Sequence, residues 1–544
     1  MVKTLNIWGN GQILAFSGID GATDYNDGIV MRTAFGEAGF NIRTPENGGR
    51  IRFDKAAIVP ERLTLAGDFF ECGDLKVAFL DTYHILFEGE FLLQPGRATE
   101  VVVNKNRILI GVQEYFNPEL IDADIDEVIA KRRAYLEEIS LPDGLSGVTV
   151  KTLTKAFSQM KTMVYAPEGE IKHRWTTPDR WPHRHMWLWD SVFHAIGFRH
   201  LNPSMAREAL LAVFDLQAED GFIPAYGAPG LRAPNTQGPV LAFGVKQVYD
   251  AEPSLNFLAK AYPHLKRYLE WDFANRDNDG AGLLEWYVEE RKDCRSGESG
   301  MDNSPRFDSA MHLDAPDFNS LISMECEIMA GFASELGLKR DRQEWMERHE
   351  KLNRLINNRL WNDDEGFYFD YDVSTGRLST VMASSGFLPL ICGAASADQA
   401  KQLASHLNNP QTFKTPMPVS SIAVCDKKSY SKDMWRGPAW VNINWLIAHG
   451  FRRYGMHEQA DMIINKTIAK IEEMYLKHGT FFEFYDDKNE VEPPQLLRKT
   501  KNIPDSFHQS FHDYGWTATL YVDMIYSRKS KTHEASVEKS YSCT

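Results

Sequence analysis

The sequence predicts a mainly α protein in which an α/α toroid follows an N-terminal antiparallel β-sandwich. Residues 1 to 115 contain short runs of alternating or β-branched residues that are separated by polar turns. From about residue 148, apolar residues recur at helical spacing. Long loops rich in Trp, Gly, Pro and acidic residues interrupt these helices. Many helices with one set of aromatic loops are typical of a toroid whose loops gather at one end.

Length and charge narrow the function classes. The chain has 544 residues, too many for one ordinary compact core, so two domains are expected. Its formal net charge is −15, which argues against a nucleic-acid partner and an anionic membrane surface. The cysteines form no Cys-x-x-Cys pair, so free thiols are expected rather than a disulfide frame or a zinc site.

The start of the chain has no basic segment followed by an apolar run, and no apolar stretch reaches the length of a membrane span. We therefore expect a cytoplasmic protein.

The β region is read from its alternation and its turns. Ile51–Phe53 alternates, and Val77–Phe87 is rich in β-branched and aromatic residues. Val101–Val103 and Ile108–Ile110 flank the turn signal of residues 104–107, which predicts a hairpin. This region shows no catalytic constellation, so a structural or docking role is expected for it.

A helical stripe between Pro118 and Ile139 marks a linker helix, which Pro142-Asp-Gly144 ends. Further helices are predicted after the Asn202 cap and over 255–269, 345–360 and 462–475. The predicted organisation is a sandwich at 1–115, a linker helix at 116–147, a helical catalytic domain at 148–527 and a frayed polar tail at 528–544.

The loop at residues 298–306, Glu-Ser-Gly-Met-Asp-Asn-Ser-Pro-Arg, is rich in turn-forming residues. Asp302 lies between a Gly and an Asn-Ser-Pro turn, which holds its carboxyl at a sharp backbone feature. Taken alone, this aspartate is better explained by capping or bracing the turn.

Two loops carry further candidates for sugar binding. Trp187, Trp189 and Asp190 resemble a sugar subsite, in which an indole covers a pyranose face and a carboxylate takes its hydroxyls. Core packing by the two indoles is the alternative. Tyr226 and Gln237 are candidate hydroxyl ligands, but the signal is weak by itself and an ordinary turn is the alternative.

The run Asn275-Arg-Asp277-Asn-Asp279-Gly matches the first half of a calcium-binding loop. However, Trp286 stands where the closing bidentate Glu belongs. A turn is favoured here, and a calcium ion is the alternative.

Two aromatic loops near the C-terminus complete the candidate set. Residues 433–445 contain Trp435, Arg436 and Trp440, and an arginine among so much aromatic surface needs a partner carboxylate. Glu483 lies between Phe482 and Phe484, so an extended backbone would direct it away from both rings. The sequence shows no P-loop, dinucleotide fingerprint, HExxH or GxSxG motif.

Together these loops resemble glycoside hydrolase family 63. The resemblance rests on Ser-Gly-Met-Asp-Asn-Ser-Pro-Arg at 299–306, Trp-Arg-Gly-Pro-Ala-Trp at 435–440, Phe-Glu-Phe-Tyr-Asp at 482–486 and Tyr-Gly-Trp-Thr at 514–517, which occur in the family's order. That family is related to the trehalases of family 37 and includes bacterial mannosylglycerate and glucosylglycerate hydrolases. The resemblance implies an (α/α)6 barrel over about residues 150–527 and hydrolysis of α-glycosides with inversion.

The resemblance also implies roles for individual residues. Asp302 matches the general acid and Glu483 the general base, which activates water on the opposite face of the sugar. Asp190 matches an acid that holds the glycone. Trp435, Arg436 and Trp440 match the loop that lines the sugar subsite, Tyr514 and Trp516 match its final aromatic wall, and Arg306 in the Asp302 motif is a further candidate for substrate binding. Apart from the resemblance, Arg436 is the hypothesised donor that keeps Glu483 ionised. No cofactor or metal is required.

Two alternatives remain at this stage. An (α/α)6-barrel epimerase or lyase would use a loop histidine or tyrosine, for which His183, His185, His508 and His512 are candidates. A non-catalytic sugar-binding protein would be expected to lack one of the two acids, and both are present. The expected partner is a small carbohydrate substrate, and a homo-oligomer is possible; which sugar and leaving group are used is left open.

Overall fold

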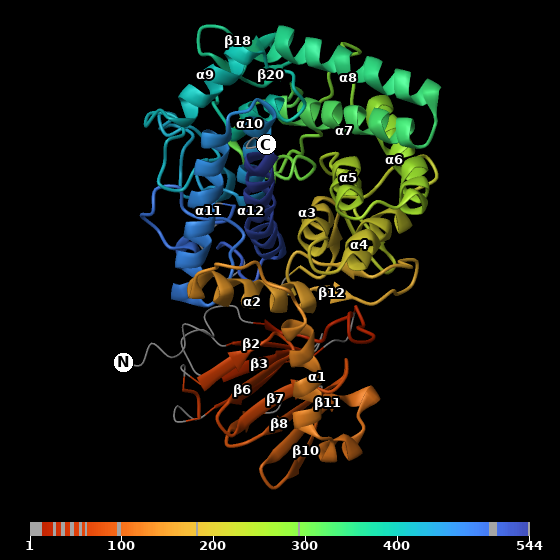
Figure 1. Cartoon of the computed structure of the whole chain (residues 1–544), viewed down its shortest axis with the longest axis vertical. Helices are drawn as coiled ribbons and strands as arrows, with labels where there is room; N and C mark the ends of the chain where they lie inside the picture. The colour runs from red at the N-terminus through yellow and green to blue at the C-terminus, as the bar shows by residue number, and fades with distance from the viewer. Residues whose placement is uncertain are drawn as a thin grey trace.

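The computed structural model describes residues 13–25, 29–33, 39–43, 48–53, 57–59, 62–94, 99–180, 183–291, 294–499 and 509–541. The chain is mainly helical, with a β-rich region at the N-terminal end. Strands β1–β11 occupy one end of the molecule and most of the helices the other, with α2 between them, α1 along the β region, and short strands such as β12 (Val164–Tyr165) among the helices (Figure 1). This agrees with the predicted order of β region and helical region.

Two antiparallel sheets make up the β region. One has the strand order β1-β2-β3-β4-β9 and the other β10-β11-β8-β7-β6-β5. Their bounds are β1 Ile13–Leu14, β2 Val30–Thr33, β3 Gly39–Arg43, β4 Gly48–Arg52, β5 Leu63–Leu65, β6 Phe69–Cys72, β7 Leu75–Phe79, β8 His84–Glu88, β9 Leu92–Gln94, β10 Thr99–Asn104 and β11 Arg107–Val112. The predicted hairpin is β10–β11, with Asn104 opposite Arg107 and Lys105 at φ +55° in its tight turn.

Alternation places one face of each sheet in a shared core. Met31 and Ile42 of the first sheet and Phe70, Val77 and Phe87 of the second belong to one buried cluster. The two sheets therefore pack face to face as a sandwich.

The outer face of the second sheet is covered by the segment predicted to be a linker helix. Phe69 and Leu86 pack there against Ile125 and Ile129 of α1 (Ile125–Glu137). The helix begins later than predicted, because Asp124 caps it and a separate 3-10 turn spans Pro118–Asp122. The segment is thus part of the β region's packing as well as its connection to the helices.

The helical region is a ring of inner elements with outer helices against it. α3, α5, α7, η7, α10 and α12 contact one another in that order, and α12 returns to α3. α2, α8 and α11 pack on the outside of this ring. The bounds are α2 Gly147–Thr162, α3 Leu188–Phe198, α4 Pro203–Asp215, α5 Leu241–Ala251, α6 Leu255–Asn275, α7 Pro316–Glu335, α8 Lys339–Leu360, η7 Ser384–Leu390, α9 Ala397–Leu407, α10 Val441–Arg453, α11 His457–His478 and α12 Gly515–Tyr541.

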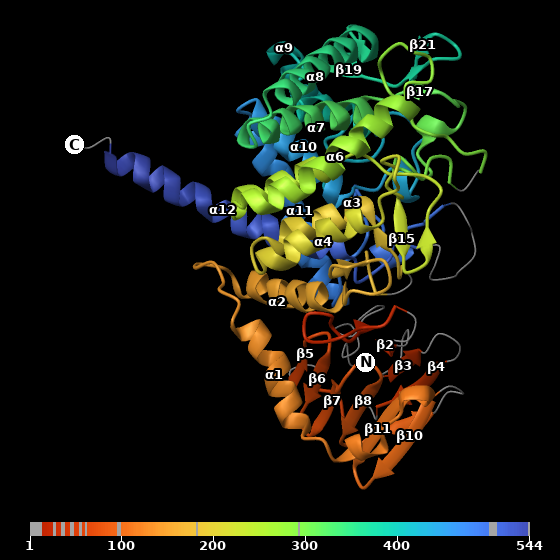
Figure 2. The same cartoon turned by 90° about the vertical axis from the view of Figure 1, so that its right-hand side faces the viewer.

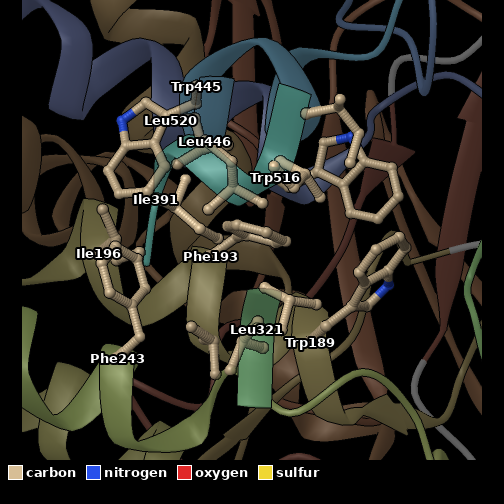
Figure 3. Close-up of a cluster of buried hydrophobic side chains, with 14 of the residues drawn as sticks. Trp189, Phe193, Ile196, Phe243, Leu321, Ile391, Trp445, Leu446, Trp516 and Leu520 are labelled. Atoms are coloured by element: carbon tan, nitrogen blue, oxygen red, sulfur yellow. The ribbon is translucent and has the colours of Figure 1, made fainter. Parts of the chain in front are cut away.

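Large apolar side chains fill the middle of the ring. Phe193 of α3, Phe243 of α5 and Trp445 of α10 point toward one another, together with Leu321 and Leu520 from α7 and α12 (Figure 3). Trp189 and Trp516 lie at the edge of the same cluster, so the apolar core continues into the loop end of the ring.

The C-terminal tail differs from its prediction. Residues 528–541 continue α12, which projects away from the rest of the molecule (Figure 2). Polar composition alone does not end a helix when no Pro or Gly interrupts it. No helix among the described residues is long and apolar enough to cross a membrane. The cysteines that the structure describes are free thiols, as predicted, while Cys543 lies outside the described residues.

Candidate active site

A cavity of about 1030 Å³ opens where the inner elements of the ring begin. Gln237 precedes α5, Asp302 precedes α7, Trp440 precedes α10, and Asp190 and Trp516 lie in the first turns of α3 and α12. Loops from distant parts of the chain therefore meet in one site. The predicted residues that line the cavity are Trp187, Trp189, Asp190, Tyr226, Gln237, Asp302, Trp440, Glu483, Tyr514 and Trp516.

Asp302 lies at the end of a tight turn whose conformation requires glycine. Gly300 has φ +70°, and a Cβ atom there would lie 2.5 Å from Cη2 and Cζ2 of Trp189. The turn is closed by Gly300 N–H donating to Gly297 and by Arg295 N–H donating to the carbonyl of Asp302. The backbone thus leaves the Asp302 carboxyl directed into the cavity.

Asn303 joins this turn to the loop that follows residue 432. Its side-chain amide donates to Asp433 Oδ1 over 2.9 Å, and its Oδ1 accepts from the backbone N–H of Trp435 over 3.0 Å. Asp433 Oδ1 also accepts from the N–H of Lys499, whose Nζ lies 2.6 Å from Asp302 Oδ2. One buried amide therefore connects the Asp302 turn with the loop that supplies its cationic partner.

Glu483 lies on an extended segment, as its position between two rings predicts. Its N–H donates to the carbonyl of Phe511 over 2.8 Å, and Phe482 pairs with His512. Phe482 and Phe484 are buried in the core, while the Glu483 side chain lines the cavity.

Arg498 is the cation that contacts Glu483. Its Nε lies 3.0 Å from Oε2 and its Nη2 lies 3.3 Å from Oε1, so the contact is bidentate. Burial disfavours the charged form of Arg498, but the carboxylates of Glu483 and then Asp302 raise the pKa of the guanidinium overall. Arg498 therefore lies within the field of both candidate catalytic carboxylates.

Asp190 is a buried acid with an unsatisfied oxygen. It is 1% exposed, lines the cavity, and its Oδ1 has no hydrogen-bond partner. Burial first, and then the carboxylates of Glu483 and Asp179, raise the pKa of Asp190 well above its usual range. A buried oxygen without a partner at a cavity wall is suited to a ligand hydroxyl. Gln237 Oε1 fixes the neighbouring backbone by accepting from Trp189 N–H over 3.1 Å.

Aromatic rings form much of the remaining wall. Trp440 lines the cavity and stacks on Trp435 with ring centres 3.7 Å apart and planes 4° from parallel. Tyr514 and Trp516 lie 4.6 Å apart, and Trp516 meets Trp189 edge-on. Flat apolar faces beside buried acids are the usual surroundings of a bound pyranose.

Three predicted residues do not line the cavity. Arg306 is buried below it, where its guanidinium contacts both Asp317 and Asp370 at 2.6 to 2.8 Å. Trp435 lies behind Trp440. Arg436 is outside the wall and forms a bidentate contact with Asp308. Residue type and proximity to a motif had suggested contact with sugar. These side chains instead contact other protein groups next to the cavity loops: acidic residues for the two arginines and Trp440 for Trp435.

The prediction that Arg436 partners Glu483 is therefore wrong, because Arg498 takes that position. The sequence at 498–501, Arg-Lys-Thr-Lys, is typical of a solvated basic turn, and only the fold brings it to two acids. Sequence reasoning also missed the cavity residues Lys499, Trp271, Tyr287 and Glu289. Tyr287 follows Glu285-Trp286 in an aromatic loop, which was the one available signal for it.

The alternative histidines have different positions. His183 lines the cavity, and its Nδ1 lies 2.8 Å from the buried Asp179. His185 packs on Tyr226 and Trp187 behind the wall, and His512 pairs with Phe482. His508 lies outside the described residues.

The calcium-like run forms a turn. Asp277 Oδ1 accepts from Gly282 N–H and Asp279 Oδ1 from Ala281 N–H, while Asp279 also contacts Arg359. Within the described part of the chain, no group of three or more His, Cys, Asp or Glu side chains is placed to hold a metal ion.

Much of the chain is similar in sequence to known glycoside hydrolases. The model of the mannosylglycerate hydrolase MGH1-like glycoside hydrolase domain matches residues 183–517. The mannosylglycerate hydrolase of Rubrobacter radiotolerans is 23% identical over 440 residues, covering 64% of this chain and 93% of that protein. The glucosylglycerate hydrolase of Mycolicibacterium hassiacum is 22% identical, covering 56% of this chain and 86% of that protein.

Solved structures show the same helical fold. The crystal structure of the family 63 mannosylglycerate hydrolase from Thermus thermophilus in complex with glucose has a TM-score of 0.57 and 23% identity. The matched region covers 68% of this chain and 99% of the Thermus thermophilus chain. Since the family match spans more than half of the sequence and contains every loop of the cavity described above, this protein belongs to the mannosylglycerate hydrolase MGH1-like glycoside hydrolases and is an enzyme of glycoside hydrolase family 63.

Proposed function

We propose that this glycoside hydrolase cleaves a small α-glucoside or α-mannoside with inversion, using Asp302 as the general acid and Glu483 as the general base. The observation that carries the proposal is that two carboxylates from loops far apart in sequence line one cavity. An inverting enzyme needs one carboxyl at the leaving oxygen and one carboxylate that activates water on the opposite face. Candidate substrates are di- or oligosaccharides and glycosylglycerates, the last suggested by the names of the relatives.

The surroundings of Glu483 support its role as the base. A general base has to remain ionised in order to accept a proton from water. The bidentate contact with Arg498 favours the carboxylate and fixes its orientation.

The acid role of Asp302 requires a rearrangement. A carboxyl that gives a proton to the leaving oxygen has to leave its ion pair with Lys499 first. We propose that substrate entry separates these two groups, and that Asn303 keeps the Asp302 backbone in place while Lys499 moves. Asp190 then holds glycone hydroxyls through its unpartnered Oδ1.

We also propose that the ring of helices is the (α/α)6 barrel of this family, with a catalytic domain beginning near residue 148 and a separate β-sandwich domain before the linker. The closed order of contacts among the inner elements supports this proposal.

The test is the configuration of the first product. Proton NMR during rapid hydrolysis of an α-glycoside is expected to show the β-anomer of the released sugar first, with the α-anomer appearing later by mutarotation. A screen of p-nitrophenyl α-glycosides, α-linked disaccharides and glycosylglycerates identifies the substrate for this measurement. Initial release of the α-anomer would rule out inversion.

A further inference from the structure

Glu483 is held at both of its backbone groups by residues of one turn. Its N–H donates to the carbonyl of Phe511 over 2.8 Å, and its carbonyl accepts from Nε1 of Trp516 over 3.3 Å. Thr517 Oγ1 donates to the carbonyl of the preceding residue, Phe482, over 2.7 Å. The conformation of residues 511–517 therefore sets where the Glu483 carboxylate lies.

Asp513 lies in the middle of this turn, in a backbone conformation that only a minority of residues other than glycine adopt. Its φ angle is +52°, in the left-handed region. Its N–H donates to Thr480 Oγ1 over 3.0 Å, and its side chain is fully buried. A sparsely populated backbone conformation persists only where its surroundings hold it in place. The groups that hold Asp513 are therefore part of what positions Glu483.

Two side chains of α2 hold Asp513. Lys155 Nζ lies 2.8 Å from Asp513 Oδ1, and the side-chain amide of Gln159 donates to the Asp513 carbonyl. Lys155 and Gln159 are four residues apart, so they share one face of the helix. Although burial acts in the opposite direction, the charge of Lys155 and the hydrogen bond with His512 lower the pKa of Asp513 below its usual value. The contact is therefore a buried ion pair between residues 358 positions apart.

The β region fixes the C-terminal turn of the same helix, which lies between it and the helical ring (Figure 1). Lys161 Nζ lies 2.8 Å from both Asp20 and Asp68, and the Lys161 carbonyl accepts from Ser17 Oγ over 2.7 Å. Lys161 and Asp68 are fully buried, and buried charges are stable only when they are paired. Both the β region and α2 lie outside residues 183–517, which the family model matches.

We propose that Lys155 and Gln159 are positioning residues for Glu483, and that they act through Asp513. The β region takes part because it fixes α2 through Lys161. This inference rests on the proposed function, since it takes Glu483 as the general base. A catalytic group has to be held within a fraction of an ångström of its productive position, so loosening the turn should lower kcat more than it weakens substrate binding.

The first experiment tests the ion pair with Lys155→Met, which keeps an unbranched side chain and removes the charge. kcat is expected to fall about 10- to 100-fold, with a smaller change in KM. The loss should be equal for natural α-glycosides and p-nitrophenyl α-glycosides, because water has to be activated in both reactions. Unchanged kcat, or a loss confined to the natural substrates, would overturn the inference.

A double variant separates positioning from stability. In Lys155→Met/Asp513→Asn the buried carboxylate is removed with its cation, and asparagine tolerates the left-handed backbone, so the melting temperature should return toward that of wild type. kcat should stay low, because Lys155 no longer links α2 to the turn. Recovery of kcat together with the melting temperature would show that the ion pair serves stability alone. This variant also supplies the test if Lys155→Met alone does not fold.

Lys470→Met is the matched control. Lys470 is 7% exposed, as is Lys155, and it pairs with the exposed Glu473 of its own helix, α11. Its kcat should equal that of wild type. A comparable loss of kcat in Lys470→Met would contradict the inference, because removal of any buried lysine would then have the same effect.

The role of the β region is tested with Lys161→Met/Asp68→Asn. This variant removes both charges of one buried pair and leaves Asp20 in contact with Arg132 at 2.6 Å. kcat is expected to fall by about three- to tenfold, again equally on both kinds of substrate. Unchanged kcat in the folded variant would overturn the role of the β region.

Failure of the proposed function is a separate outcome. If Glu483 is not the general base, Glu483→Gln keeps its kcat whatever the result for Lys155→Met.

Discussion

The α-carbon of Gly300 lies directly against the indole of Trp189, so closely that a Cβ atom there would come within 2.5 Å of two ring carbons. This contact joins the turn that presents Asp302 to the helix start that presents Asp190. This backbone-to-ring contact therefore links the segments that carry the two acids, which are more than one hundred residues apart in sequence.

Gly300→Ala is expected to reduce kcat/KM by at least about 100-fold and to lower the melting temperature. The added methyl group clashes with Trp189, and φ +70° is strained for alanine. Steady-state kinetics and thermal unfolding check this. Gly331→Ala in α7 is the control, since a Cβ atom there meets no other atom within 4 Å. Full activity in Gly300→Ala would show that the turn tolerates displacement.

Asp302→Asn and Glu483→Gln are each expected to lower kcat by about 10²–10⁴-fold on natural substrates while the fold survives. Asp302→Asn should recover much of its activity with a leaving group that needs no protonation, such as p-nitrophenolate, whereas Glu483→Gln should not. Kinetics on both substrate types and circular dichroism measure this. Asp308→Asn, at a partly exposed acid nearby, should stay close to wild type. Equal rescue of both variants would contradict the separate roles.

Arg498 and Arg436 make a matched pair of arginine variants. Arg498→Ala leaves Glu483 buried without its cation, so kcat should fall by at least about 100-fold. Arg436→Ala removes a contact with the half-exposed Asp308, which is worth about 1 kcal/mol or less, and should have a small effect on kcat. Steady-state kinetics of the two variants measures both losses. A larger loss of kcat in Arg436→Ala than in Arg498→Ala would support Arg436 as the partner of Glu483.

Asp190→Asn is expected to lower kcat/KM by about 100-fold through a lost hydroxyl contact, and to raise stability relative to wild type as pH rises. The pKa of Asp190 in the folded protein lies well above its usual value. Above about pH 4 this side chain therefore ionises in the unfolded chain but keeps its proton in the folded protein, and this difference favours unfolding. The melting temperature of the variant minus that of wild type should therefore grow as the pH rises above about 4. A difference that does not change with pH would show that Asp190 is ionised in the folded protein.

Asp523 is expected to make the helical ring sensitive to acid. It accepts hydrogen bonds from Arg199 and His200 at the end of α3 and from Trp445 of α10. Although burial acts in the opposite direction, the hydrogen bond from His200 and the charge of Arg199 lower the pKa of Asp523 well below its usual value. The stability this provides is present above about pH 4 and is lost as pH falls below it.

Asp523→Asn should accordingly cost about 3–5 kcal/mol at neutral pH and flatten the acid limb of the stability curve. Denaturant unfolding from about pH 3 to pH 7 measures this effect. Asp461→Asn, whose contact with Arg452 is exposed, is expected to change stability by less than about 1 kcal/mol. An unchanged acid limb in Asp523→Asn would place the acid sensitivity elsewhere.

The sequence by itself determined the local features of this protein. A turn signal between two β-branched runs predicted the β10–β11 hairpin, Asn202 predicted the start of α4, and the rings beside Glu483 predicted which way its carboxyl points. These features follow from periods of two or 3.6 residues and from caps, which act over a few neighbours. The motifs around Asp302 and Glu483 likewise indicated the enzyme family through residue identity and order alone.

Only the tertiary structure decided which charges meet. Arg436 and Arg498 are both basic residues near aromatic loops, and nothing local distinguishes them; closure of the ring places Arg498 on Glu483 and Arg436 on Asp308. Ion pairs between distant loops depend on where whole elements lie, whereas a cap or a turn depends on its neighbours alone. The same holds for Tyr25, whose contacts with His185 and Glu168 depend on how the N-terminal region packs on the helical ring.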